Sequence, residues 1–509
     1  MFDPVTALNA PNSALFWGRQ SWLDALGVVL AHSPARVQTT NDPAAVPALL
    51  AAVEEEAANG LWVAFYVSYE AGAAYELANL PPGDLVPLAW MAAYDPANTH
   101  LLPPEALPML PAPEGLQDVQ PTLNVSRETY GDALDRIHEY IACGDTYQVN
   151  YTCHARFHLD CDPLAYYLTM VRSHPVPYAA YLNLGDRQVL SISPELFLQR
   201  RGNTISSRPM KGTRKRGRTP AEDAALAKDL TTSLKDRAEN LMILDMERND
   251  LGRIARIGSV RVPHMFTSEK YRSVWQMTST VEAELQPGVT LPDLFAATFP
   301  GASITGAPKR RTMEIIRELE PEPRGLYCGA LGLHQPGTDF TCGLPIRTLV
   351  HQNGDFDLGI GAGILWDSLT GSEYEETLLK ARFAFRSQAD LTLFETLLLQ
   401  EDGQYAYLEA HLSRLQASAD YFDFPCDVAA LRELLLEVGG PSSEVSGRSA
   451  PPSATGVRWH DSDEATRVGG LSSPASLPCI VRLDLTADGR HTITTRPPPP
   501  PPPTPVRVL

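Results

Sequence analysis

The chain has 509 residues, of which 44% are hydrophobic and 20% charged, which is typical of a globular protein with a buried core. It contains no run of about 18 apolar residues, and its N-terminus, Met-Phe-Asp-Pro, lacks the basic and apolar regions of a signal peptide, so we expect a cytoplasmic protein. The net charge of −19 argues against a surface for nucleic acid or anionic membrane. An anionic metabolite can still bind, because its site needs only local positive groups.

The first part of the chain predicts mixed helices and strands. Residues 1–125 combine apolar alternation with Pro-rich and Ala-rich connections, and 61–70 is expected to form a strand before a turn at Gly72. Apolar side chains at helical spacing predict a helix over 127–144, where Gly144-Asp145 ends it. The strands expected next are 149–157, 179–184 and 188–192.

One long helix is predicted over residues 220–250. Thr219 is a good N-cap, and Pro220 suits the first helical position. Glu222 stands three residues after the cap, where a capping box requires an acid. Gly252 is expected to end the helix.

Two further helices and three strands are predicted before residue 386. One helix begins near Pro308 and ends at Glu320, because prolines follow. The other begins at Ser372, with Glu375 in the capping-box position, and continues to about Phe385. The strands are expected at 327–334, 345–351 and 356–365, with an Asn353-Gly354 hairpin turn between the last two.

Eight short motifs follow one another between residues 193 and 376. They are Ser193-Pro-Glu195-Leu-Phe, Arg208-Pro-Met-Lys211-Gly-Thr213, Asp236-Arg-Ala-Glu239-Asn, Arg248-Asn-Asp-Leu-Gly252, Gly306-Ala-Pro-Lys309, Ile346-Arg347-Thr348, Gly359-Ile-Gly-Ala-Gly363 and Glu373-Tyr-Glu-Glu376. In this order they resemble the chorismate-utilising family, which includes anthranilate synthase component I, aminodeoxychorismate synthase component I, and the isochorismate and salicylate synthases.

The resemblance implies a fold as well as a chemistry. It predicts an α+β fold like that of anthranilate synthase component I, with antiparallel sheets packed around the active site and helices outside. Residues 126–386 would form the chorismate-binding catalytic domain. Residues 1–125 would pack with it, because Val67-Ser-Tyr-Glu-Ala71 also resembles the family.

Chorismate carries two carboxylates and a hydroxyl that is a poor leaving group, so its site needs a divalent cation, a cationic clamp, an acid and a nucleophile or base. Glu239 and Glu376 are suitable Mg²⁺ ligands, since this hard cation needs only one or two protein carboxylates beside water and substrate oxygens. Glu373, Glu376 and Lys380 lie on one helical face, and Lys380 is expected to bind the substrate. The alternative is an ordinary solvated stripe of charges.

Arg347 stands in an otherwise apolar strand, where its charge needs an anionic partner. The resemblance assigns the enolpyruvyl carboxylate, helped by the hydroxyl of Tyr327, and the alternative is a buried bridge to Asp or Glu. Backbone N–H groups of a glycine-rich strand end and of a helix N-terminus can also approach a carboxylate closely. The residues expected to do so are Thr305, Gly306, Gly361, Ala362 and Gly363.

Lys211 is the most informative position of the motifs. Aminodeoxychorismate synthases carry lysine there, whereas anthranilate synthases ordinarily carry alanine. The resemblance implies that Lys211 adds to C2 of chorismate while Glu195 protonates the departing C4 hydroxyl, after which ammonia enters at C4. The alternative from the residues alone is a surface lysine in a basic loop, since Arg214, Lys215, Arg216 and Arg218 follow it.

The implied function is the synthesis of 4-amino-4-deoxychorismate for folate. No strand-turn-helix elbow for a glutaminase nucleophile is evident, so a separate glutamine amidotransferase subunit is expected to supply ammonia. The alternatives are anthranilate synthase component I, an isochorismate or salicylate synthase that uses lysine as a base for water, and a non-catalytic chorismate-binding regulator.

Residues 387–509 are predicted to be a truncated lyase. Leu393-Phe-Glu-Thr396 and Glu409-Ala-His411-Leu-Ser-Arg414-Leu415 resemble the start of aminodeoxychorismate lyase, a pyridoxal-phosphate enzyme. That chemistry needs a Schiff-base lysine, and no lysine follows Lys380. No pyridoxal phosphate is therefore expected. Residues 439–478 are predicted to be a disordered insert, and 497–503 a polyproline tract.

Overall fold

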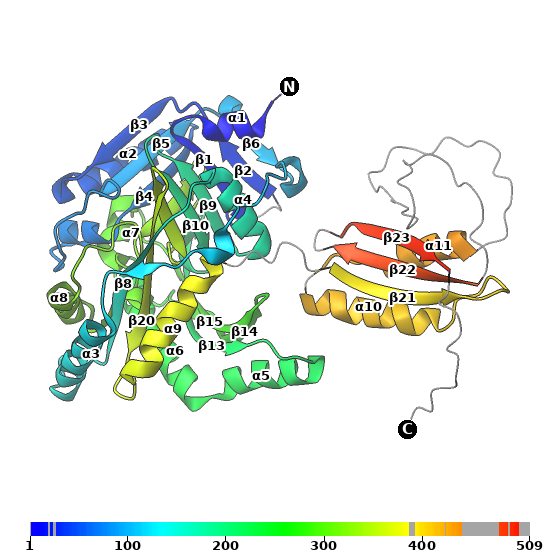
Figure 1. The fold of residues 1–509 in the computed structure, drawn as a ribbon. Coiled ribbons are helices and arrows are strands. Elements are labelled where there is room, and N and C mark those ends of the chain that lie inside the picture. The colour runs from blue at the N-terminus through cyan, green and yellow to red at the C-terminus, as the bar shows by residue number, and fades with distance from the viewer. Residues whose placement is uncertain are drawn as a thin grey trace. The chain divides into compact units, whose positions relative to one another are not determined.

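The computed structural model describes residues 2–18, 21–23, 27–385, 392–422, 424–439, 478–486 and 489–497. The chain divides into two compact units, Met1–Ser387 and Gln388–Leu509 (Figure 1). The predicted insert at 439–478 and the proline tract at 497–503 lie outside the described residues, except at their ends. No helix in the described ranges is both long and apolar enough to cross a membrane.

Two antiparallel sheets form the first unit. The first runs in the order β16-β8-β20-β19-β10-β9-β1-β2-β6, with β7 beside β8. Its strands are β1 (Ser13–Gly18), β2 (Gly27–Ala31), β6 (Thr99–Leu102), β7 (Thr122–Leu123), β8 (Gln148–His158), β9 (Tyr178–Asn183), β10 (Gln188–Ser193), β16 (Gly306–Ala307), β19 (Thr348–Gln352) and β20 (Asp355–Ile364).

The second sheet runs in the order β13-β15-β12-β11-β18-β17-β4-β5-β3, with β14 beside β15. Its strands are β3 (Arg36–Thr40), β4 (Trp62–Val67), β5 (Ala89–Tyr94), β11 (Leu196–Arg201), β12 (Thr204–Arg208), β13 (Met210–Lys215), β14 (Arg261–Lys270), β15 (Val274–Glu284), β17 (Ala330–His334) and β18 (Phe340–Gly343). Residues 1–125 thus contribute strands to both sheets.

The sheets pack face to face because their side chains alternate. On β4, Ala64 and Tyr66 enter an apolar cluster shared with Phe16 of the first sheet, whereas Val63 and Phe65 face the helical side. Helices cover the outer faces of the two sheets (Figure 1). They are α1 (Pro4–Asn9), α2 (Val46–Ala58), α3 (Arg127–Ala142), α4 (Pro163–Ser173), α5 (Pro220–Thr232), α6 (Leu234–Gly252), α7 (Leu291–Thr298), α8 (Lys309–Leu319) and α9 (Thr370–Ala381). The expected α+β fold is confirmed.

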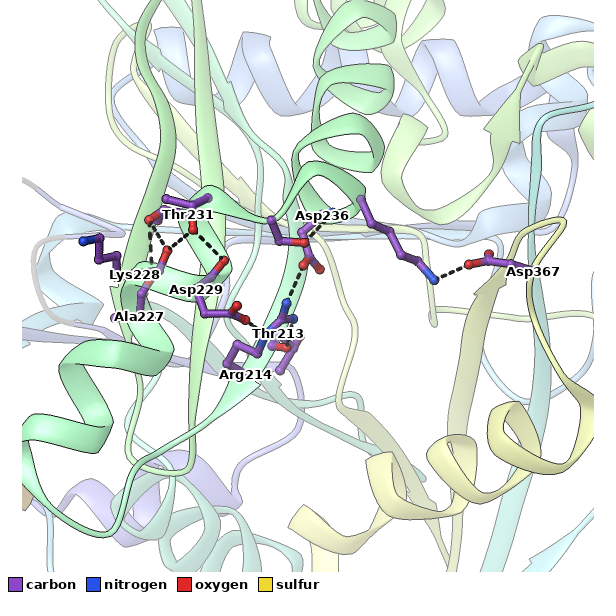
Figure 2. Close-up of polar contacts among 11 residues, drawn as sticks. Thr213, Arg214, Ala227, Lys228, Asp229, Thr231, Asp236 and Asp367 are labelled. Carbon is purple, nitrogen blue, oxygen red and sulfur yellow. Dashed lines mark hydrogen bonds and ion pairs between the residues drawn. The ribbon is translucent and has the colours of Figure 1, made fainter.

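The single helix predicted over 220–250 is wrong, because the chain breaks between α5 and α6. Ser233 has an extended backbone (ψ 120°), and its hydroxyl accepts a hydrogen bond from the Asp236 amide to cap α6. The Thr231 hydroxyl donates to the Ala227 carbonyl at 3.3 Å and the Lys228 carbonyl at 3.0 Å (Figure 2). Hydroxyl side chains that bond to the backbone compete with the helical ladder, which explains the break.

The last helix of the unit also differs from its prediction. Helix α9 begins at Thr370, and Leu369 in its N-cap position makes no capping bond. Ser372 is not the N-cap, since its hydroxyl donates instead to the Leu369 carbonyl at 2.9 Å. Residues Arg382–Phe385 form a tighter 3₁₀ turn.

Two of the predicted strands begin later than expected. Cys328 has φ +65° and Arg347 has φ +51°, and neither value is extended, so β17 begins at Ala330 and β19 at Thr348. Arg347 therefore lies before its strand, not inside it. The predicted hairpin is confirmed: Asn353 and Gly354 have φ of +53° and +87°, as a type I′ turn requires.

The second unit contains the three-stranded antiparallel sheet β21-β22-β23. Its elements are β21 (Thr392–Leu399), α10 (Leu408–Phe422), α11 (Val428–Gly439), β22 (Cys479–Thr486) and β23 (His491–Arg496). Alternate residues of β21 are buried, and Glu395 among them pairs with His411 at 2.7 Å and with Arg414. This sheet and its helices share an apolar cluster of their own.

Candidate active site

Lys211 lies at an irregularity of β13. The pairing with β15 shifts register between Met210 and Thr213, and Gly212 has φ +96°, a conformation that glycine adopts without strain. Burial lowers the pKa of Lys211, and the carboxylates of Glu195, Glu239 and Glu376 oppose that shift. A lysine with a lowered pKa holds a larger fraction of neutral amine, which is the form that acts as nucleophile or base.

Ion pairs fasten this strand to the two helices that follow it (Figure 2). Arg214 Nε lies 2.7 Å from Asp229 Oδ2 on α5, and its Nη2 lies 2.7 Å from Asp236 Oδ2 on α6. Lys235 Nζ lies 2.7 Å from Asp367 Oδ2, which joins the start of α6 to the segment before α9. Arg214 is thus paired within the protein and positions the strand that carries the lysine.

Glu195 lies between β10 and β11 and is 5% exposed. The Ser303 hydroxyl donates a hydrogen bond to Glu195 Oε1 at 2.6 Å. Burial raises the pKa of Glu195 to about 7, although the Ser303 hydrogen bond and the Lys211 charge act in the opposite direction. A carboxyl group with a pKa near 7 can hold a proton at neutral pH and release it during a reaction.

The glycine-rich end of β20 lies beside Lys211. Lys211 Nζ is 3.2 Å from the point where a Cβ on Gly363 would stand, so a side chain there would crowd the amine. Lys380 Nζ donates to the Gly361 carbonyl at 3.0 Å and lies 2.9 Å from Glu376 Oε1. Ala362 points the other way, into the apolar core, so only its backbone can face the site.

Thr305 and Gly306 lie before β16 and within it, ahead of the helix α8. Thr305 is fully buried, and its hydroxyl donates to the Gly301 carbonyl at 3.1 Å. A Cβ on Gly306 would stand 2.0 Å from the Gln148 carbonyl oxygen, so this close approach to β8 requires glycine. These residues therefore fix the β8 end of the site through the backbone.

Tyr327 and Arg347 lie in the segments directly before β17 and β19, where Cys328 and Arg347 have positive φ. The guanidinium of Arg347 has no carboxylate partner among the described residues, and burial lowers its pKa. The alternative of a buried bridge to Asp or Glu is therefore not seen in this part of the chain. The ring of Tyr327 stacks on Gly359, where a Cβ would lie 2.2 Å from the ring carbon Cγ.

Glu239 and Glu376, the two expected metal ligands, lie on different helices, and both carboxylates interact with the Lys211 amine. Glu239 on α6 is half-buried and its carboxylate forms no hydrogen bond or ion pair in the described ranges, and burial raises its pKa. Glu376 on α9 is exposed. The described residues contain no group of three or more His, Cys, Asp or Glu side chains arranged for a metal. Two carboxylates with water and substrate oxygens suit Mg²⁺, so these residues fit that ion.

Gln148 is a residue that the sequence analysis did not single out. Both atoms of its amide are buried without a hydrogen-bond partner, and its Nε2 lies 3.2 Å from the same Cβ position on Gly363 that Lys211 approaches. Unpaired buried polar atoms are rare in proteins, and here they lie at the edge of the site. It stands directly before the strand predicted at 149–157, a place that gave no sequence signal.

A cavity of about 770 Å³ lies near the opposite end of the β8 and β20 pair, lined in part by His154, Arg156 and Asp357. These side chains already satisfy one another: His154 Nδ1 is 2.6 Å and Arg156 Nε is 2.7 Å from Asp357 oxygens. None of the residues expected to act on chorismate lines it. The candidate active site is therefore the cluster around Lys211.

Residues 13–386 match the family of chorismate binding enzymes. Aminodeoxychorismate synthase component 1 of Bacillus subtilis is 38% identical over 345 residues, 68% of this chain and 70% of that protein. Anthranilate synthase component 1 of Neisseria gonorrhoeae is 40% identical over 278 residues, 55% of this chain and 57% of that protein.

The structural comparison agrees with the fold. The crystal structure of anthranilate synthase component I from Streptococcus pneumoniae has a TM-score of 0.60 at 26% identity, and covers 70% of this chain and 92% of that one. The expected likeness to the anthranilate synthase component I fold is confirmed.

Proposed function

We propose that this chain, which belongs to the family of chorismate binding enzymes, converts chorismate and ammonia into 4-amino-4-deoxychorismate. The observation that carries the proposal is the lysine at position 211, whose pKa is lowered by burial beside Glu195. The relative from Bacillus subtilis, an aminodeoxychorismate synthase component 1, is similar over most of its length.

The chemistry follows from the two central side chains. The neutral amine of Lys211 forms a bond to C2 of chorismate, the ring double bonds shift, and the bond from C4 to its hydroxyl oxygen breaks. Glu195 gives its proton to that oxygen, which leaves as water. Ammonia then forms a bond at C4, the double bonds shift back and the lysine is released as an amine. The Glu195 carboxylate takes one proton from the new C4 ammonium group, which leaves an amino group and restores the acid. The net reaction replaces one hydroxyl by one amino group and releases one water.

Around these two groups, other residues would hold the substrate. Arg347 is a guanidinium without a carboxylate partner in the described ranges, so it suits the enolpyruvyl carboxylate, with Tyr327 beside it. Glu239 and Glu376 would hold Mg²⁺, which when bound draws electron density from the ring through the ring carboxylate. The backbone of Gly361 to Gly363 would approach that carboxylate.

We infer that a separate glutamine amidotransferase subunit supplies the ammonia. Relatives named component 1 imply a partner component. With the purified chain alone, glutamine should not replace ammonium.

The deciding experiment is product identification by mass spectrometry after incubation of the purified chain with chorismate, Mg²⁺ and ammonium. Aminodeoxychorismate is expected, and chelation of the metal should stop its formation. Anthranilate, isochorismate or salicylate as the product would assign one of the other enzymes. Tight chorismate binding without turnover would show a regulator, and turnover with glutamine alone would contradict the partner subunit.

For residues 388–509 we propose that no pyridoxal phosphate is bound as a Schiff base, because no lysine follows Lys380. The chain alone should not convert aminodeoxychorismate into 4-aminobenzoate. Pyridoxal phosphate added to the protein should give no imine absorbance band assignable to this unit. A band that borohydride removes, with the label found beyond residue 390, would refute the proposal.

A further inference from the structure

We propose that Ser303 and Glu247 are positioning residues that orient the acid Glu195, an inference that rests on the proposed function. Neither residue belongs to the set that would touch chorismate or metal. Both are buried, with 6% and 3% of their surface exposed. They act through a short 3₁₀ turn, η6 (Ala302–Ile304), which lies between α7 and β16.

Ser303 is hydrogen-bonded directly to Glu195. The serine hydroxyl donates to Oε1 at 2.6 Å. When the carboxyl group is protonated, an oxygen that accepts such a bond is the poorer place for the proton, so the proton is held on Oε2. Ser303 therefore disfavours the proton on Oε1, and the Met210 amide is a second hydrogen-bond donor to the same carboxylate.

A second hydrogen bond attaches the turn η6 to the helix α6. Glu247 Oε1 accepts a hydrogen bond at 3.2 Å from the amide of Ala302, the residue directly before Ser303. Glu247 follows Glu239 by about two helical turns, so the helix that carries an expected metal ligand also holds the turn that orients the acid. Burial raises the pKa of Glu247 to about 7.

Other contacts limit the movement of the turn. Arg324 Nη1 donates to the Ile304 carbonyl at 2.8 Å, and the Thr305 hydroxyl donates to the Gly301 carbonyl. The turn is thus held before, at and after Ser303. Such support is what an active-site group needs to keep one geometry.

Among the described residues, few charged groups face the two carboxyl groups. Lys211 lowers the pKa of Glu195, and the Cys328 thiol also interacts with it. Glu247 faces Asp250 and Lys309, whose Nζ lies 2.7 Å from Asp250 Oδ2, with the Ser207 hydroxyl nearby. Because the Ser303 hydrogen bond stabilises the carboxylate of Glu195, its loss must raise the pKa of Glu195.

The experiment measures kcat against pH for the full chain with ammonium. In the wild-type protein, activity should fall as the pH rises through the pKa of Glu195, which is about 7. Ser303→Ala should move this fall to higher pH and lower the maximal kcat on the order of tenfold. Ser303→Thr, which keeps the hydroxyl, should restore the wild-type profile.

Glu247 is tested in the same way. Glu247→Leu removes the acceptor for the Ala302 amide and should move the fall in the same direction, whereas Glu247→Gln keeps an acceptor and should stay close to the wild type. Ser191→Ala is the matched control. It removes another buried hydroxyl, which lies 2.9 Å from the Thr348 hydroxyl and does not touch Glu195. The pH of the fall should not change in that variant.

Titration of the Glu195 carboxyl group by carbon-13 NMR in the folded protein gives its pKa without turnover. The pKa can therefore be compared even in a variant that is inactive. An unchanged Glu195 pKa in Ser303→Ala would overturn the role of Ser303, and an unchanged pKa in Glu247→Leu that of Glu247. A wild-type protein that forms no aminodeoxychorismate would instead refute the proposed function, which separates the two failures.

Discussion

Lys211→Ala should lower the rate of aminodeoxychorismate formation on the order of a thousandfold or more, while chorismate still binds. The nucleophile divides one difficult displacement into two easier steps, so its loss costs several kcal/mol of transition-state stabilisation. Glu239, Glu376 and Arg347 would still hold the substrate. Steady-state kinetics and calorimetric titration with chorismate measure the two effects separately.

Lys211→Arg is the control that separates a nucleophile from a charge. Arginine keeps the positive charge but cannot act as the nucleophile, so it should be as inactive as alanine. In the wild-type protein without ammonia, intact-mass measurement should find a chorismate-derived adduct at Lys211. Full activity of Lys211→Ala would contradict the assignment and would indicate direct attack of ammonia.

Local sequence patterns predicted the elements that local physics decides. The Asn353-Gly354 turn follows from two residues that accept positive φ, and the alternation of the buried β4 side chains between two apolar clusters follows from strand geometry. The break at Ser233 was not predicted, because no proline or glycine interrupts the sequence between Pro220 and Gly252. Only the hydroxyl bonds of Thr231 and of Ser233 itself, visible in three dimensions, show why the helix stops.

The candidate site was predictable where a motif exists and hidden where contacts join distant segments. Lys211 and Glu195 stood in motifs. Ser303 meets Glu195 across 108 residues of sequence, and Glu247 meets Ala302 across 55. No local sequence pattern indicates such a contact. In sequence, a buried glutamate inside a charged helix has the same surroundings as a glutamate on the surface. Burial and partner geometry alone distinguish them.

The second large effect is expected at Arg324, whose guanidinium hydrogen-bonds to the turn η6 beside the candidate site. The Arg324 side chain is 1% exposed. Its guanidinium donates to the Glu320 carboxylate at 2.7 and 2.9 Å. It also donates to the Ile304 carbonyl at 2.8 Å and to the Asn150 carbonyl at 2.7 Å. Arg324→Met should lower the free energy of unfolding by about 3–5 kcal/mol, because it leaves the Glu320 carboxylate buried without its cation.

Urea unfolding followed by tryptophan fluorescence measures this loss, since six of the seven tryptophans lie in the first unit. Arg310→Met, at a side chain that is 65% exposed, is the matched control and should change the free energy by less than about 0.5 kcal/mol. Replacing Glu320 by methionine together with Arg324 should recover most of the loss, because both charges then leave the interior. A double variant as unstable as Arg324→Met would mean that the backbone groups left unpaired, which are the Ile304 and Asn150 carbonyls and the Thr152 amide, carry the cost instead of the unpaired carboxylate.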